Sequence, residues 1–147
     1  MFNYSLFIGV DVSKAVIDVS YFLNGQVIYL GQYFNSTKDF EMLVKDLSIK
    51  SSLSLDQWFV CFENTGPYSK ELLYWLIEQG IPCCEENPLA IKKSLGIRRG
   101  KDDKCDSKDI CYYAFEKRDR LKPTQMDKPF IISLKTLLSR RDLLVKQ

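Results

Sequence analysis

Histidine is absent from this sequence, and that absence excludes several kinds of active site at once. Without histidine there is no Ser-His-Asp triad, no Cys-His dyad and no histidine-ligated iron. The cysteines also form no Cys-x-x-Cys pair, which argues against a zinc site and favours reduced thiols. They are Cys61, Cys83, Cys84, Cys105 and Cys111. An enzyme with this sequence therefore has to work with carboxylates, lysine, tyrosine, serine or cysteine.

The chain also lacks long apolar runs and a strong charge of either sign. No run approaches the roughly 20 apolar residues that span a bilayer, and the N-terminus has no signal-peptide pattern. The net charge of +2 is too small to indicate a nucleic-acid partner by itself. A chain of 147 residues, 46% of them hydrophobic, is long enough to bury a core. We therefore expect a cytoplasmic protein with no membrane contact and one main domain.

Three short strands are expected in the first 34 residues. One holds Asp11, a second covers residues 15–22 and a third covers residues 26–33. Asn24-Gly25, between the last two, is a strong hairpin signal because a type I′ turn needs positive φ at both central residues. A helix is predicted next, over residues 37–49, from its apolar face and from Ser36 and Asp39, which are spaced as in a capping box.

Helices and strands then alternate along the chain. A strand ends at Glu63, a helix runs from near Pro67 to Gly80, and a short strand (residues 81–84) and a helix (residues 88–95) follow. The order is β-β-β-α-β-α-β-α. Three meandering strands followed by alternating helices and strands predict an α/β fold, with a mixed sheet and flanking helices. This is the element order of the RNase H-like fold.

Four carboxylates stand in contexts that suit a divalent-metal site: Asp11, Glu63, Asp103 and Asp106. Asp11 lies within an apolar strand and Glu63 ends another, where an ionised side chain needs a cation or hydrogen-bond donors. Asp103 and Asp106, at the start of a further predicted helix, would project from one helical face. An RNase H-like sheet would bring the four together, and such a cluster suits two-metal phosphoryl transfer with Mg²⁺ or Mn²⁺.

Each of these carboxylates also has an ordinary structural explanation. An aspartate in an apolar strand is often a hydrogen-bonded core or edge residue, and carboxylates are favoured electrostatically in the first turn of a helix. Asp18 is interpreted as an alternating strand residue outside the site, and Asp102 and Asp109 as neighbours of the helical pair. What favours a metal site is the expected convergence of the four side chains, not any one of them.

A basic segment leads into the helical pair and is interpreted as a phosphate-binding surface. The alternative interpretation is an ordinary solvated loop. Gly96 and Gly100 would allow its backbone to bend. The cations of the segment are Lys92, Lys93, Arg98, Arg99, Lys101 and Lys104, and a later group, Lys117, Arg118, Arg120 and Lys122, would extend the same surface.

The last residues predict an amphipathic helix over residues 129–147, with no signal for its C-terminal end. Its apolar side chains, at mostly three- and four-residue steps, are Phe130, Leu134, Leu137, Leu138 and Leu144. We expect residues 1–122 to form the catalytic domain and residues 123–147 to form a helical linker or the start of a coiled coil. The chain is then a fragment of a longer protein.

Three motifs resemble those of the DEDD transposases, a family that includes the Piv-type DNA invertases and the bridge-RNA-guided insertion-sequence recombinases. The first strand motif is Gly9-Val10-Asp11-Val12-Ser13-Lys14, and the second is a Glu-x-Thr-Gly turn, Glu63-Asn64-Thr65-Gly66-Pro67-Tyr68. The third is Gly100-Lys101-Asp102-Asp103-Lys104-Cys105-Asp106-Ser107. It departs from the family pattern at two positions, where Asp102 replaces a threonine and Ser107 an alanine, so Asp102 competes with Asp103 as the expected ligand.

The resemblance implies a RuvC-like catalytic fold in which Asp11, Glu63, Asp103 and Asp106 bind Mg²⁺ and promote strand exchange between DNA sites. It also implies a structured guide RNA as a partner, homo-oligomers formed through the C-terminal helix, and a second domain carrying a catalytic serine. Two alternatives remain open at this stage. One is a stand-alone RuvC-like nuclease that cleaves Holliday junctions, and the other is a non-catalytic RNase H-like module that binds nucleic acid.

Overall fold

A mixed five-stranded sheet forms the centre of the molecule, as the element order predicts. The computed structural model describes residues 3–96, 105–125, 131 and 133–140. The strand order is β3-β2-β1-β4-β5. The pairs β1–β2 and β2–β3 are antiparallel, while β1–β4 and β4–β5 are parallel. The strands are β1 (Leu6–Val12), β2 (Val16–Leu23), β3 (Gln26–Phe34), β4 (Trp58–Glu63) and β5 (Cys83–Glu86).

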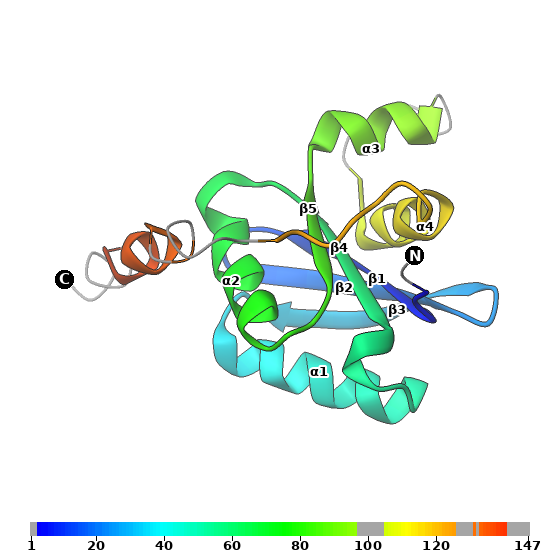
Figure 1. Cartoon of the computed structure of the whole chain (residues 1–147), viewed down its shortest axis with the longest axis horizontal. Coiled ribbons are helices and arrows are strands. Elements are labelled where there is room, and N and C mark those ends of the chain that lie inside the picture. The colour runs from blue at the N-terminus through cyan, green and yellow to red at the C-terminus, as the bar shows by residue number, and fades with distance from the viewer. Residues whose placement is uncertain (1–2, 97–104, 126–130, 132, 141–147) are drawn as a thin grey trace.

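Helices cover both faces of this sheet (Figure 1). The α-helices are α1 (Thr37–Ser51), α2 (Lys70–Glu78), α3 (Pro88–Leu95) and α4 (Ser107–Glu116). Helices α1 and α2 pack on one face, and α3 and α4 on the other. Two short 3-10 helices, η1 (Leu55–Gln57) and η2 (Gly66–Ser69), flank β4. The helix expected to begin near Pro67 therefore begins as the 3-10 turn η2, and α2 proper starts at Lys70.

Local signals in the sequence set two of the connections. Asn24 (φ 53°) and Gly25 (φ 83°) both adopt positive φ, so the β2–β3 turn has the type I′ character that Asn-Gly predicts. At the start of α1, the Ser36 side chain accepts a hydrogen bond from the Asp39 backbone N–H. The Asp39 carboxylate accepts from the backbone N–H of Phe34 rather than from that of Ser36. Ser36 is therefore an N-cap, but the expected capping box is not complete.

Each face of the sheet has its own apolar core, because successive strand residues point to opposite faces. The core shared with α1 and α2 contains Ile8, Val10, Val60, Phe62, Phe40, Leu47, Leu72, Trp75 and their neighbours. The core shared with α3 and α4 contains Phe7, Phe59, Cys61, Cys84, Ile91, Leu95, Ile110, Tyr113 and Ala114. Alternate residues of β1 and β4 thus belong to different cores.

Helix α4 lies directly against the backbone of β1 at Gly9. A Cβ atom at this position would lie 2.7 Å from Cys111 Cα and closer still to the backbone of Ser107 and Cys111. Only glycine allows this approach. The buried Ser107 hydroxyl also forms a 2.7 Å hydrogen bond with the Ser20 hydroxyl on β2. These contacts fix the N-terminal turn of α4 over the centre of the sheet.

The chain after α4 returns along β5, where the Thr124 N–H donates to the Cys83 carbonyl at 2.7 Å. Residues 133–140 are helical, as expected, with Leu134 buried and Leu137 exposed. This helix lies at the side of the molecule that carries α2 (Figure 1). The rest of the predicted segment, residues 129–130, 132 and 141–147, falls outside the described residues. The coiled coil and the domain boundary at residue 122 stay predictions.

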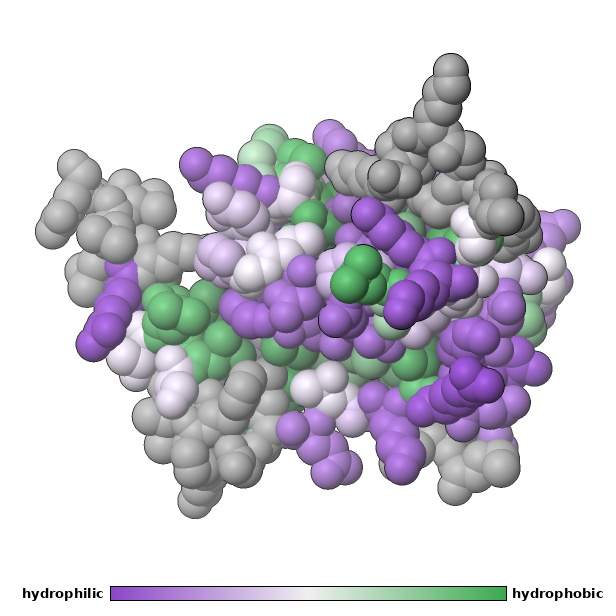
Figure 2. All heavy atoms as spheres, turned by 90° about the horizontal axis from the view of Figure 1, so that it is seen from above, coloured by the Kyte–Doolittle hydropathy of each residue, from purple (hydrophilic) through white to green (hydrophobic). Residues whose placement is uncertain are grey.

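On the face seen in Figure 2, hydrophilic residues cover most of the described surface, and the hydrophobic residues form separate patches. Within the described ranges, no helix has the length and apolar character to cross a membrane.

Candidate functional site

Asp11 and Glu63 lie side by side on neighbouring parallel strands. The β1–β4 register pairs Val10 with Phe62, so the next residue of each strand, Asp11 and Glu63, continues that register. Paired strands lie about 4.8 Å apart. Both side chains point to the α4 face, since Asp11 is two residues after Gly9 and Glu63 two after Cys61. Both are half-buried. The expected convergence of these two predicted residues is therefore present.

Two further carboxylates continue this row across the sheet. Asp18 on β2 pairs in register with Asp11, and Glu86 on β5 pairs with Glu63. Directly paired residues share a face, so Asp18, Asp11, Glu63 and Glu86 form one line on the α4 face. From the sequence, Asp18 was interpreted as lying outside the site, and Glu86 was not among the predicted site residues. Their place in this row follows from the sheet register, which is known only once the strand order is known.

Hydrogen bonds from tyrosines hold the outer members of the row. The Tyr29 hydroxyl donates to Asp18 Oδ1 at 2.7 Å, and the Tyr113 hydroxyl of α4 donates to Glu86 Oε2 at 3.0 Å. The Asp18 carboxylate raises the pKa of Tyr29 mainly through this hydrogen bond. Burial, and then the bond to Glu86, raise the pKa of Tyr113. Both phenols therefore stay protonated at neutral pH and act as donors that orient the two carboxylates.

Asp106 caps α4 at the end of the helix that faces the row. Its Oδ1 accepts a hydrogen bond from the Asp109 N–H at 2.9 Å, and Asp109 Oδ2 accepts from the Asp106 N–H at 3.2 Å. This reciprocal pair is a capping box. Helix α4 runs from Gly9 towards Phe7, because Ser107 lies against Gly9 and Phe115 against Phe7. The positive end of its dipole is thus on the side of Asp11 and Glu63, where it favours negative charge.

Several predicted residues fall outside the described part of the chain. They are Asp103, Arg98, Arg99, Lys101 and Lys104, together with the competing Asp102. Lys92 and Lys93 are described, and both lie in the last turn of α3. Among the described residues, no group of three or more Asp, Glu or Cys side chains is arranged to hold a metal ion. The four-carboxylate site therefore stays a prediction.

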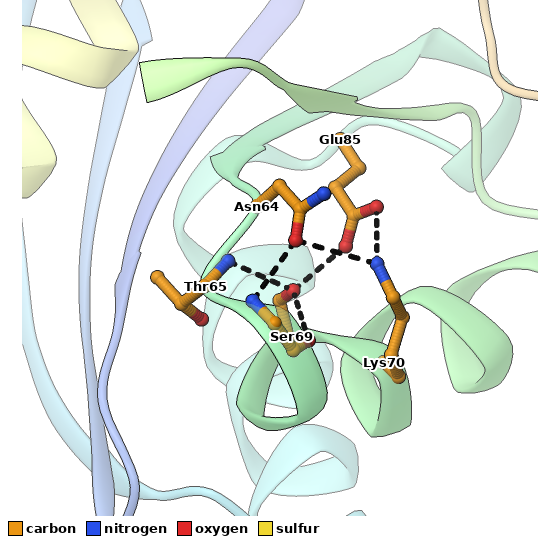
Figure 3. A network of polar contacts seen from close by, with 6 residues as sticks. Asn64, Thr65, Ser69, Lys70 and Glu85 are labelled. Carbon is orange, nitrogen blue, oxygen red and sulfur yellow. Dashed lines mark hydrogen bonds and ion pairs between the residues drawn. The ribbon is translucent and has the colours of Figure 1, made fainter. Parts of the chain in front are cut away.

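A polar network fixes the turn that follows Glu63 (Figure 3). Lys70 Nζ donates to Glu85 Oε1 at 2.7 Å, and the Ser69 hydroxyl donates to Glu85 Oε2 at 2.7 Å. Ser69 Oγ in turn accepts from the Thr65 N–H at 3.2 Å. Asn64 Oδ1 accepts from the Gly66 N–H at 2.9 Å. A carboxylate of β5, on the face away from the row, thereby anchors the Glu-x-Thr-Gly turn.

Asn35 joins the ends of the two strands that carry Asp11 and Glu63. Its Nδ2 donates to the carbonyl of Ser13, just after β1, at 3.0 Å and to the carbonyl of Tyr68, in η2, at 2.9 Å. The amide therefore holds the two loops at a fixed separation. The side-chain oxygens of Asn35 and Thr65 are buried, and within the described residues neither has a hydrogen-bond partner.

The cysteines have structural positions. All five are buried and unbridged, which agrees with the expected reduced thiols. Burial is the main cause that raises the pKa of Cys61 well above 9.0 and those of Cys83, Cys84 and Cys111 to about 12. These four side chains are therefore thiols at neutral pH and not thiolate nucleophiles. Cys105 is a core residue as well.

Comparisons with known proteins identify a family and two solved structures to which this chain is similar. A family model described as transposase, of the DEDD type named after IS110, matches residues 8–147. No curated protein matches the chain. Among solved structures, YeaZ from Pseudomonas aeruginosa is similar, with 14% identity over 65% of this chain and 49% of that chain and a TM-score of 0.43. An uncharacterized protein with similarity to peptidase YEAZ, also from P. aeruginosa, gives the same values. The chain thus spans about half the length of both structures.

Proposed function

The chain belongs to the IS110-type DEDD transposase family, and from that premise we propose that Asp11, Glu63, Asp103 and Asp106 bind Mg²⁺ or Mn²⁺ and act in DNA strand exchange during transposition. The observation that carries the proposal is the register of Asp11 beside Glu63 on one face of the sheet. Two like charges on directly neighbouring strand positions repel one another. Asp11 and Glu63 would hold a divalent cation, whose positive charge would offset that repulsion.

The chemistry of the donors fits such an ion. Magnesium and manganese prefer carboxylate oxygen and retain several waters, so a few acidic side chains are enough. Asp11 and Glu63 are held on paired strands, and Asp106 begins the helix whose N-terminus lies against Gly9. The buried Thr65 hydroxyl, in the same turn as Glu63, is a further polar group that a bound water or phosphate oxygen would satisfy.

A divalent cation at this site would activate a nucleophilic oxygen and stabilise the leaving oxygen at a DNA phosphate. The task of the protein is then to position its ligands before DNA arrives. The Asn35 bonds fix the loops after β1 and β4, and the Glu85 network fixes the turn after Glu63. The partly described basic segment, from Lys92 to Lys104, would hold the phosphate backbone.

The experiment that tests this proposal is Mn²⁺ binding by calorimetry on the intact chain. We expect Asp11→Asn and Glu63→Gln each to abolish binding, because each removes one charge from the paired carboxylates. Asp103→Asn and Asp106→Asn should weaken or abolish it as well. Glu78→Gln, at the exposed end of α2, is the matched control and should bind Mn²⁺ like the parent protein.

Retention of Mn²⁺ binding by both Asp11→Asn and Glu63→Gln would exclude the proposed site. If the parent chain binds no Mn²⁺, the titration is repeated with DNA present, since the substrate phosphate supplies further oxygen ligands. Failure there too would favour the non-catalytic module. Cleavage of a synthetic four-way junction by this chain alone would favour a stand-alone nuclease instead. The guide RNA, the homo-oligomer and the serine-bearing domain stay predictions drawn from the family.

A further inference from the structure

A hollow lined by apolar and charged side chains lies at the opposite end of α4 from the carboxylate row. It has a volume of about 390 Å³ and lies between the chain entering β1 and the residues that follow α4. We call it the Tyr4 pocket. Its wall residues are Asn3, Tyr4, Phe7, Arg118, Leu121 and Lys122, with Asp119 at the rim. Phe7 and Asp11 are four residues apart on β1, so the two sites lie about 13 Å apart along the strand.

Aromatic rings form one wall of the Tyr4 pocket and are held rigidly. The Tyr4 ring packs 5.1 Å from the Phe59 ring, centroid to centroid. The Phe7 ring meets the Phe115 ring edge-on at 5.5 Å. Tyr4 is half-buried, so part of its surface remains accessible at the pocket. A flat ligand can pack against such a wall without the entropic cost of ordering the wall side chains on binding.

Cations form the other wall. The Arg118 guanidinium lies over the Phe115 ring, 4.2 Å from its centroid, and its Nη1 donates to the Phe115 carbonyl at 2.7 Å. Lys122 is exposed and lines the same hollow. Among the described residues that line the hollow, Asp119 is the one acidic residue. The residues from Lys117 to Lys122 include four cations and this single carboxylate, so the local charge is positive.

The helix dipole explains only part of this positive charge. Cations are stabilised near the last turn of a helix, and that accounts for Lys117 and Arg118. The effect falls off within one turn, whereas Lys122 lies six residues beyond Glu116, the last residue of α4. A cation there, beside an aromatic wall, has no helical explanation. Phosphate beside a base is a ligand whose charge and shape match both walls.

We propose that the Tyr4 pocket binds one unpaired nucleotide of a nucleic-acid strand. The base packs against the accessible part of Tyr4, and the phosphate contacts Lys122 and Arg118. The volume is at the lower end of the range for small-ligand sites, which suits a single nucleotide rather than a duplex. The contact needs no metal ion and uses none of the four proposed metal ligands. It would give the domain a second hold on a strand, at the end of α4 remote from the carboxylates.

The test is fluorescence anisotropy of labelled oligo(dT) and oligo(U), in EDTA and at low salt. We expect Tyr4→Leu to weaken binding about tenfold, within the range for loss of one base–aromatic stack. Lys122→Gln should weaken oligonucleotide binding several-fold. It should also lower the slope of log affinity against log salt concentration by about one unit, which corresponds to one lost phosphate contact. Lys45→Gln, an exposed cation on α1, is the matched control and should bind like the parent chain. Thermal melting checks that the Tyr4 variant is folded.

Photocrosslinking gives a second measurement that does not depend on a variant. A 5-bromouracil oligonucleotide should crosslink to Tyr4, and mass spectrometry locates the crosslinked peptide. No oligonucleotide binding by the parent chain, unchanged affinity in both variants, or crosslinks confined to other elements would each overturn the proposal. Because these titrations are run in EDTA and need no metal ion, failure of the metal site and failure of the Tyr4 pocket are distinguishable. Comparing oligo(dT) with oligo(U) shows which strand the pocket prefers.

Discussion

The two faces of the sheet use the same strands for different purposes. On one face, α1 and α2 cover an apolar core in which the strands contribute Ile8, Val10, Val60 and Phe62. On the other face, the alternate residues include Phe7, Gly9 and Cys61, but each of these runs ends in a carboxylate, Asp11 or Glu63. The first face is covered by apolar packing, whereas the second face carries carboxylates at the ends of its strands.

The difference follows from how each face is covered. Helix α4 crosses the second face with its N-terminus at Gly9, so it packs over Phe7 and Cys61, and its contact with the carboxylate row is the Tyr113 hydrogen bond to Glu86. Glycine at position 9 lets α4 approach the backbone of β1 closely, so there is no space for a larger residue between them. One face therefore supplies most of the apolar burial, and the other positions charged side chains. Four changes test this division, from the largest expected effect to the smallest.

Phe40→Ala should cause the largest loss of stability, because Phe40 is fully buried on α1 and packs 5.7 Å from the Trp75 ring. We expect the free energy of unfolding to fall by about 3–5 kcal/mol, from the lost transfer energy and the cavity. Urea denaturation measures it. Met42→Ala, on the same helix but 51% exposed, is the control and should change stability by less than about 0.5 kcal/mol. Equal effects of the two changes would contradict the described core.

Gly9→Ala should act on the α4 face alone. The added methyl group would overlap the backbone of Ser107 and Cys111, so α4 must move away from β1. We expect a loss of about 2–3 kcal/mol, typical of overpacking a rigid site. Hydrogen exchange should show lower protection in α4 than in α1. Uniform loss of protection in both helices would mean that the two faces do not separate as described.

Breaking the Lys70–Glu85 ion pair should have a smaller effect on stability and a specific effect on the turn after Glu63. The pair is only partly buried, with side-chain exposures of 21% and 12%, so we expect a coupling energy of about 1 kcal/mol. A double-mutant cycle with Lys70→Met and Glu85→Gln measures it. Glu85→Gln should also weaken Mn²⁺ binding at the proposed site, while Glu78→Gln should not. A coupling energy near zero would show that the network does not hold the turn.

Alkaline pH should weaken both faces gradually. Folding raises the pKa of Cys83 and Cys84 from 9.0 to about 12, so the folded chain keeps protons that the unfolded chain loses. Stability is then unaffected well below pH 9 and falls as the pH rises from 9 towards 12. At pH 9 the loss is below about 1 kcal/mol per thiol. Cys83 and Cys84 lie on opposite faces of the sheet. Cys83→Ala and Cys84→Ala should each remove the contribution of one thiol from the pH dependence of the free energy of unfolding, measured by urea denaturation. An unchanged slope in both variants would contradict the burial of these groups.

Local signals predicted much of the fold. The Asn24-Gly25 turn, the N-cap at Ser36 and the helix from Pro88 to Leu95 all depend on interactions within a few residues, and all are present. The site was predicted less completely. Asp11 and Glu63 were recognisable as charges at the ends of apolar runs, and they do lie side by side. Asp106 was recognised as well, but its capping bond to Asp109 was not predicted, because that bond depends on the backbone geometry of the helix start.

The sequence by itself determined the order of helices and strands, the type I′ hairpin and the candidate carboxylates, because these depend on short-range periodicity, φ preferences and residue type. Only the tertiary structure decided which carboxylates stand in one row. Asp18, Asp11, Glu63 and Glu86 come from four strands, and their alignment depends on register across pairs that are far apart in the chain. It also decided that Gly9 must be glycine, because that requirement comes from α4, roughly a hundred residues later.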